Sequence, residues 1–176
     1  MLLQVCASLF SNMTKLKSFL RAAVIASVMA GVMANAQQLG TKRTLNLAVA
    51  KAIAAAAEKE AMANHWAMYI TIVDETGTPM FVERTDDAQL ASYDISVGKA
   101  QTAFRFKRPT KMMEEAVNGG RTSTITLPRA TLLEGGIPFM VEGRLIGAIG
   151  VSGGAANQDS QVAQAGVAAL EALLKK

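Results

Sequence analysis

The sequence has almost no cysteine and almost no histidine, and both scarcities restrict its chemistry. Cys6 and His65 are the single representatives of their types among 176 residues. One thiol cannot form an internal disulfide, and one imidazole cannot build a metal site from several histidines. Stability must therefore come from packing, for which the chain is long enough.

The first 36 residues have the three-part layout of a secretory signal peptide. A basic cluster ends at Arg21, an uncharged apolar run covers 22–36, and Ala34 and Ala36 match the small-x-small cleavage pattern. The apolar run is shorter than the roughly 20 residues that a membrane-spanning helix needs. The pattern therefore favours a cleaved leader over an uncleaved N-terminal anchor.

We expect cleavage after Ala36, which gives a leader with an N-terminal extension (1–36) and a mature domain (37–176). The mature domain would be periplasmic or secreted and would have no stable membrane span. The first twelve residues read as an upstream extension, so the start is either Met1 or Met13. Because Cys6 lies in the leader, the mature domain contains no thiol.

The mature region is nearly neutral. The whole chain has 18 Lys and Arg against 14 Asp and Glu, and the leader contains three of the basic residues and none of the acidic ones, which leaves 15 against 14. Domains that bind nucleic acid usually carry a clear basic excess. We therefore expect no nucleic-acid partner.

Hydrophobic periodicity predicts that helices and β-hairpins alternate along the mature region. The first helix is expected to begin at an N-cap, Thr44, and Thr110 is expected to cap a later short helix. Two hairpins separated by helices favour a single α+β domain with helices packed on an antiparallel sheet. The predicted elements are helix 44–64, hairpin 66–84, helix 92–108, helix 110–120, hairpin 137–151 and helix 157–176.

Two glycines, Gly147 and Gly150, lie inside the second predicted hairpin, where glycine weakens a strand. Glycine at these positions is explained if another backbone, a helix or a ligand approaches the strand closely. The segment GVSGG lacks the lysine and the spacing of a phosphate-binding loop. Tight packing of a helix on the sheet is therefore the favoured interpretation.

Basic and apolar side chains gather toward the end of the helix predicted over 92–108. Residues three and four apart share a helix face, and cations there can receive carboxylates. Met112 and Met113 would supply an apolar wall. An alternative is that the cations only complement the helix dipole. The candidate ligand-binding residues are Lys99, Thr102, Arg105, Phe106 and Arg108.

The one imidazole, His65, would be the obvious axial ligand of a heme iron. It follows the predicted helix end at Asn64 and precedes Trp66, and this setting favours a surface or structural role. The acidic pairs 86–87 and 114–115 are candidates for a carboxylate-only metal site, although adjacent acidic residues are usually solvated. We assign no metal site.

Three separated segments resemble the GlcG/HbpS family of heme-binding or heme-degrading domains. They are VDETGTPMFVERTDDA, SVGKAQTAF and GGIPFMVEGRLIGAIGVSGGAANQDSQVAQAGVAAL. The resemblance extends from about residue 45 to residue 170. It implies an α-β-α layered, profilin-like domain that often assembles into homo-oligomers.

The resemblance also implies a function. It favours a secreted protein that binds or senses a small, anionic molecule, with heme or a related tetrapyrrole as the ligand. The family also includes proteins encoded beside glycolate or diol catabolism genes, and domains attached to cobalamin adenosyltransferases. The alternative is therefore a small enzyme or accessory protein of carboxylic-acid or alcohol catabolism that holds a carboxylate through Lys99 and nearby arginines. A purely structural oligomer is a third hypothesis, and catalytic activity stays open.

Overall fold

Helices and strands alternate along the described residues, 41–175, of the computed structural model, and one compact domain begins at Arg43. The expected leader, 1–36, lies outside the described residues. Among the described helices, none combines the length and the apolar character that crossing a bilayer requires. The elements are α2 (Leu47–Ala63), β1 (Tyr69–Val73), β2 (Pro79–Arg84), α3 (Ala91–Phe106), α4 (Thr110–Asn118), the 3-10 helix η1 (Thr122–Thr126), β3 (Gly136–Val141), β4 (Arg144–Ser152) and α5 (Ala156–Leu174).

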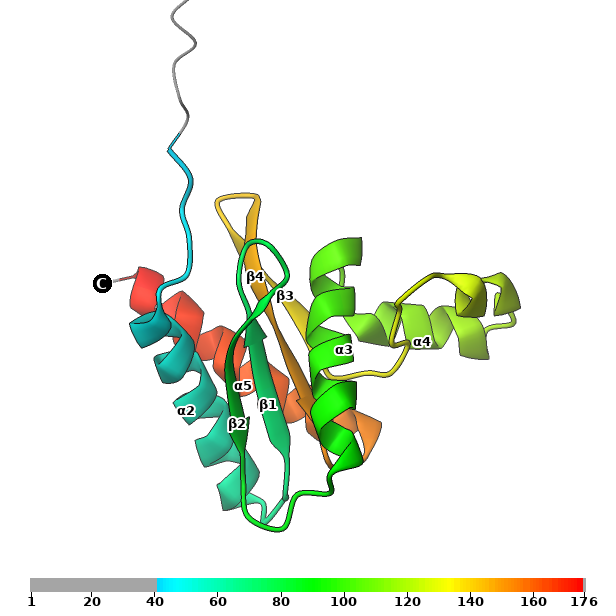
Figure 1. Ribbon diagram of the computed structural model, residues 1–176, viewed down its shortest axis with the longest axis horizontal. Helices are drawn as coiled ribbons and strands as arrows, with labels where there is room; N and C mark the ends of the chain where they lie inside the picture. The colour runs from blue at the N-terminus through cyan, green and yellow to red at the C-terminus, as the bar shows by residue number, and fades with distance from the viewer. Residues whose placement is uncertain (1–40, 176) are drawn as a thin grey trace, which may run out of the picture. The chain divides into compact units, whose positions relative to one another are not determined.

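The four strands form one antiparallel sheet in the order β2-β1-β4-β3 (Figure 1). The two hairpins, β1–β2 and β3–β4, join through β1 and β4, which pair from Tyr69 opposite Ser152 to Val73 opposite Ala148. All five residues of β1 are buried, because helices cover both faces of this central strand. The predicted α+β class with an antiparallel sheet is confirmed.

Helices cover the sheet on both sides. In Figure 1, α3 runs upright beside β1 and in front of part of β3 and β4, and α5 lies behind the strands beside α2. The larger core lies between the sheet and the α2–α5 pair, and a smaller one lies under α3. The predicted α-β-α layering is therefore confirmed. The larger core includes Ile53, Ala57, Ile70, Ile72, Phe139, Ile149, Val151, Val162 and Leu170.

Two predicted helix caps are wrong. The N-cap of α2 is Asn46, whose side-chain oxygen accepts the backbone N–H of Val49 at 2.9 Å. Thr44 lies two residues too early to do this. The residue expected to cap α4, Thr110, is its first helical residue instead. Its hydroxyl accepts the backbone N–H of Gly136 at 2.9 Å, and this bond holds the start of α4 against β3.

The strand glycines allow backbones to meet, as their position in the sequence suggested. A β-carbon at Gly150 would overlap the carbonyl oxygen of Ser96 and the backbone nitrogen of Ala100, both in α3. A β-carbon at Gly147 would overlap the carbonyl oxygen of Val73 in the neighbouring strand. The helix α3 therefore lies directly on the backbone of β4.

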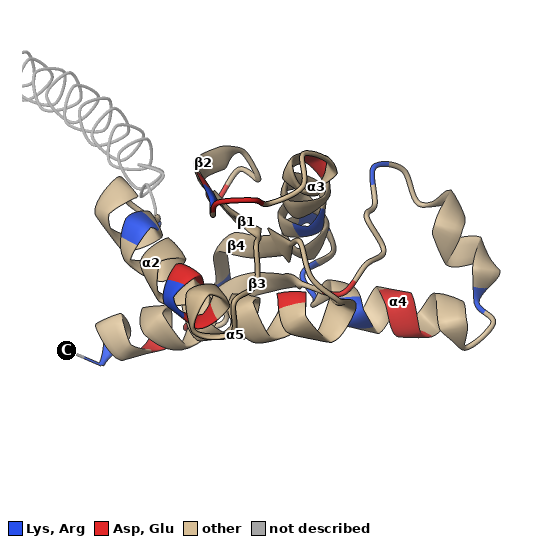
Figure 2. Cartoon of the chain, turned by 90° about the horizontal axis from the view of Figure 1, so that it is seen from below, with Lys and Arg blue, Asp and Glu red and all other residues tan. Residues whose placement is uncertain are grey.

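The segment that follows α3 leaves the body of the domain. Residues 110–126, here called the arm, comprise α4 and η1, which pack on each other. Both views of the chain show α4 extending away from the sheet and η1 turning back beside it (Figures 1 and 2). None of the buried residues of the two cores comes from the arm, which therefore lies outside them.

The substitution Gly150→Ala should destabilise the protein, although alanine is the better strand residue. The added methyl group would meet backbone atoms of α3, which cannot move aside as a side chain can. Overpacking of this kind costs about 1–3 kcal/mol, and we expect a loss near 3 kcal/mol in the free energy of unfolding, measured by urea titration.

A matched control is Gly143→Asn in the turn between β3 and β4. Gly143 has a φ of 74°, which asparagine tolerates, and a β-carbon there meets nothing within 4 Å. This variant should change the free energy of unfolding by less than about 1 kcal/mol. Equal losses in the two variants would contradict the packing explanation.

Candidate functional site

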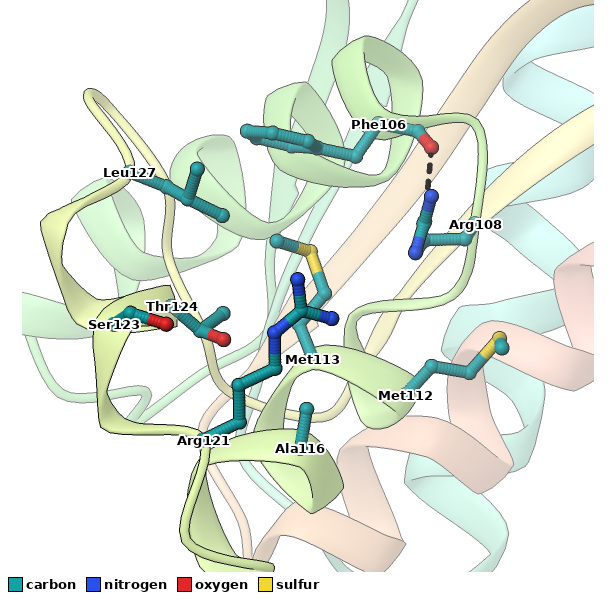
Figure 3. A pocket seen from close by; sticks show the side chains of 9 residues that line it. All are labelled: Phe106, Arg108, Met112, Met113, Ala116, Arg121, Ser123, Thr124 and Leu127. Atoms are coloured by element: carbon teal, nitrogen blue, oxygen red, sulfur yellow. Dashed lines mark hydrogen bonds between the residues drawn. The ribbon is translucent and has the colours of Figure 1, made fainter.

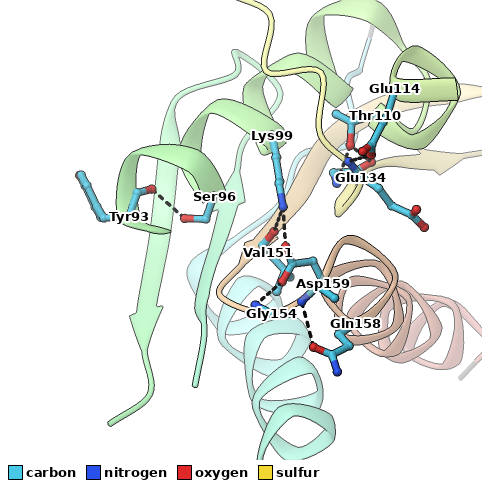
Figure 4. Close-up of polar contacts among 12 residues, drawn as sticks. Tyr93, Ser96, Lys99, Thr110, Glu114, Glu134, Val151, Gly154, Gln158 and Asp159 are labelled. Carbon is cyan, nitrogen blue, oxygen red and sulfur yellow. Dashed lines mark hydrogen bonds and ion pairs between the residues drawn. The ribbon is translucent and has the colours of Figure 1, made fainter. Parts of the chain in front are cut away.

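Lys99 lies in the interior and not on a binding surface. Its ammonium nitrogen is 2.6 Å from the carboxylate of Asp159 and donates to the carbonyl oxygen of Val151 at 2.9 Å (Figure 4). Both charged side chains are only 3% exposed. The pair joins α3 to the first turn of α5, on opposite faces of the sheet.

Asp159 has several partners besides Lys99. Its second carboxylate oxygen accepts the backbone N–H of Gly154 at 2.9 Å, just before α5 begins. Burial raises the pKa of Asp159 above its ordinary value, while the positive charge of Lys99 and the hydrogen bonds from Lys99, Gly154 and Gly153 oppose this rise. The ammonium of Lys99 is therefore committed to a neighbouring carboxylate and a carbonyl.

Thr102 and Arg105 both bond from α3 to the segment 129–131. The buried hydroxyl of Thr102 donates to the carbonyl of Gly98 at 2.7 Å and accepts the backbone N–H of Thr131 at 2.8 Å. The exposed Arg105 donates to the carbonyl of Arg129 at 3.3 Å. Both residues hold the segment before β3 against the helix.

A pocket of about 360 Å³ opens between the end of α3 and the arm (Figure 3). Its walls are mainly apolar, with two arginines and two hydroxyl groups among them. In Figure 3 the side chain of Met113 extends toward Phe106, while Met112 lies apart at the side of Arg108. The lining residues are Phe106, Arg108, Met112, Met113, Ala116, Arg121, Ser123, Thr124 and Leu127.

The two arginines of the pocket have no carboxylate partner among residues 41–175. Arg108 donates to the carbonyl oxygen of Phe106 at 3.2 Å. The guanidinium of Arg121 reaches into the pocket beside Met113 and makes no hydrogen bond or ion pair with the described chain (Figure 3). Cations beside an apolar wall attract an anion that has an apolar body.

The surroundings of the pocket are basic as well. Basic residues lie at the end of α3, at the start of α4, in the turn between α4 and η1 and in the loop after η1 (Figure 2). Between residues 105 and 129 the chain has only two acidic residues, both in α4. An anion approaching this region is therefore attracted before it makes contact. The basic residues of this stretch are Arg105, Lys107, Arg108, Lys111, Arg121 and Arg129.

Two contacts tie α4 to the loop before β3. Lys111 pairs with Glu134 at 3.0 Å, and the carboxylate of Glu114 accepts the backbone N–H of Glu134 at 2.6 Å. The hydrogen bond and charge of Glu134 raise the pKa of Lys111. These contacts fix one wall of the pocket and leave Arg108 and Arg121 unneutralised.

The structure divides the predicted basic patch. It brings Phe106 and Arg108 together in the pocket, with Met112 and Met113 beside them as the expected apolar wall. Lys99 and Thr102 are buried away from the pocket, because both side chains bond to other groups inside the chain. The residues that sequence reasoning missed are Ala116, Arg121, Ser123, Thr124 and Leu127. The one signal for them was the glycine pair 119–120, which stops α4 and turns the chain back.

His65 lies far along the chain from this pocket, in a hollow of about 460 Å³ where α2 ends and β2 finishes. The side chain is exposed, as the sequence suggested. Acidic residues surround it, including Glu58, Asp86 and Asp87. Within residues 41–175 no three histidine, aspartate or glutamate side chains are grouped closely enough to hold a metal ion.

Comparison with known proteins agrees with this fold. The family model described as "Haem degrading protein HbpS-like" matches residues 45–168. The chain belongs to the HbpS-like family. Protein GlcG of Escherichia coli K12 is 47% identical over 113 residues, which cover 64% of this chain and 84% of GlcG.

Two solved structures in the comparison share the fold. Protein ORFY of Klebsiella pneumoniae superposes with a TM-score of 0.71 at 34% identity, covering 77% of this chain and 97% of ORFY. A structure titled as the PduOC:heme complex superposes with a TM-score of 0.66 at 30% identity, covering 72% of this chain and 95% of that one. The HbpS-like fold therefore includes a protein solved with heme.

Removing the charge of Lys99 should destabilise the HbpS-like domain strongly. In Lys99→Met the carboxylate of Asp159 stays buried without its counter-ion, and breaking a buried pair in this way costs about 3–5 kcal/mol. In the double variant Lys99→Met/Asp159→Asn no charge is left unpaired, and the amide oxygen still accepts the Gly154 N–H. We expect the double variant to be more stable than Lys99→Met in urea unfolding.

The pH dependence of Lys99→Met provides the control. Without the ammonium, the pKa of Asp159 rises further in the folded state. A raised folded pKa gives stability that is present below the unfolded value, 3.8, and is lost as pH rises through the folded pKa. The deficit of Lys99→Met should therefore shrink from pH 7 toward pH 4, and a deficit independent of pH would contradict the role of the pair.

Proposed function

We propose that this HbpS-like protein binds heme or a related tetrapyrrole at the pocket between α3 and the arm. The observation that carries the proposal is the pair of guanidinium groups, Arg108 and Arg121, that face an apolar pocket without a carboxylate partner in the described chain. A tetrapyrrole with propionate groups combines a flat apolar body with carboxylates at one edge. Membership in the family and the likeness to a heme complex support the same ligand.

Each part of the pocket has a role toward such a ligand. Arg108 and Arg121 receive the carboxylates, and arginine can do so with two parallel hydrogen bonds. Phe106, Met113 and Leu127 supply apolar surface for the ring. Ser123 is placed at the rim to bond a carboxylate oxygen. Heme, when bound, would add the redox and oxygen chemistry of its iron.

The size of the pocket sets how much of the ligand enters. Ligand pockets usually measure roughly 300–1,000 Å³, so 360 Å³ is near the lower limit. The pocket therefore holds the carboxylate edge and part of one face of a macrocycle. The remaining part extends into solvent or against a second subunit of the homo-oligomer that the family resemblance leads us to expect.

A small carboxylic acid is the second candidate ligand, and the modest volume of the pocket favours it. This function corresponds to an enzyme or accessory protein of acid or alcohol catabolism. The carboxylate would be held by the same two arginines and not by Lys99, whose ammonium is already paired. The two functions are distinguished by titrating the protein with a small organic acid in the presence of hemin and measuring which of the two ligands stays bound.

Hemin should bind the purified protein at micromolar concentration and shift the Soret band. Replacing Arg108 or Arg121 with methionine removes a charged hydrogen bond worth about 1.5–3 kcal/mol. Each replacement should therefore raise the Kd for hemin roughly 10- to 100-fold, since 1.4 kcal/mol corresponds to a factor of ten.

The matched control is Lys51→Met, which removes an exposed cation from α2, away from the arm. It should leave the Kd within about twofold, because a distant exposed charge is screened by salt. The absence of any Soret shift in the wild type would remove heme as the ligand. Equal weakening in all three variants would argue against a specific role for the pocket arginines.

We also propose that the protein is exported. If the leader is cleaved after Ala36, the protein recovered from the periplasm or medium should begin at Gln37, and its intact mass should match residues 37–176. Replacing Ala36 with an arginine should block cleavage, because the signal peptidase accepts small residues at this position. A cytosolic protein that retains Arg21 would contradict the proposal.

A further inference from the structure

The donor atoms around the pocket suggest how the ligand is recognised. None of the nine lining residues is a histidine, a cysteine or a tyrosine, the side chains that most often bind heme iron firmly. The thioether sulfurs of Met112 and Met113 and the two hydroxyl groups are the remaining donors. The Met112 side chain is exposed and lies apart from Met113 (Figure 3).

Met113 has a structural explanation. It is 5% exposed and belongs to α4, where its side chain fills space between this helix and Phe106. A flexible thioether is well suited to filling an irregular apolar wall. Leucine would preserve most of that packing while removing the sulfur.

The imidazole of His65 is not available to this pocket. It lies in the hollow at the end of α2, and the two cavities share no lining residue. That hollow is also lined by three carboxylates, Glu58, Asp86 and Asp87, against one guanidinium, that of Arg84, so its net negative charge would repel propionates. The pocket therefore combines two arginines with an apolar wall but contains no imidazole.

We infer that the pocket recognises the carboxylate edge and the apolar ring of a tetrapyrrole and does not depend on the metal at its centre. This inference rests on the proposed function, and it names the ligand class as dicarboxylate porphyrins with or without iron. The binding energy comes from the guanidinium groups of Arg108 and Arg121 and from burial of the ring edge. The charged contacts of the protein would go to the carboxylates of the ligand and not to its central metal.

The test compares hemin with iron-free protoporphyrin IX on the full mature protein. Hemin binding is followed by absorption, and protoporphyrin binding by its fluorescence. The two Kd values should agree within about fivefold, a difference smaller than one good hydrogen bond supplies. Arg121→Met should weaken both ligands by similar factors, while Lys51→Met should weaken neither.

The variant Met113→Leu separates packing from iron ligation. We expect any change in its hemin Kd to be matched by an equal change in its protoporphyrin Kd, because leucine alters only the apolar surface that both ligands would contact. A loss of hemin affinity that spares protoporphyrin would show that the sulfur ligates iron and would overturn the inference. Protoporphyrin binding 100-fold weaker than hemin would also overturn it, while the proposed function would stand. If neither porphyrin binds, both the inference and the proposed function fail.

Discussion

The backbone of α3 lies directly on β4, with no side chain between them at Gly150, and the other features of the domain take their positions from this contact. A helix so close to a strand is fixed in height and direction, because neither backbone can yield. The end of α3 carries Phe106 and leads into α4. The location of the pocket is therefore a consequence of the packing at a glycine on another element.

The buried ion pair between Lys99 and Asp159 also constrains the position of α3. It connects α3 with the start of α5 beside the C-terminal end of β4, where the carbonyl oxygen of Val151 also accepts from the ammonium (Figure 4). Desolvation offsets much of the attraction in a pair of this kind, so its net contribution to stability is small. A displacement of α3 that separates the two buried charges is costly, and this cost favours the observed placement of the helix.

The sequence predicted the architecture better than the site, for physical reasons. Periodicity and turn residues are local signals, and they located both hairpins and the helices around them. The predicted cap of α2 is wrong because Thr44 and Asn46 are both good capping residues, and local preference does not choose between them. The predicted cap of α4 is wrong because the hydroxyl of Thr110 bonds to the backbone of Gly136, a tertiary contact that the local sequence does not reveal. Lys99 was assigned to ligand binding because its spacing places it on the face of Phe106. Its partner, Asp159, is 60 positions away along the chain, and single-sequence patterns carry no information about such pairs.

The pocket is built almost entirely from one continuous stretch, residues 106–127, whereas the sheet and its covering helices come from the rest of the chain. Under the proposed function, the residues that contact the ligand and those that form the cores therefore lie in separate parts of the sequence. If the pocket binds the ligand, mutations in this stretch would alter its specificity while the cores are preserved.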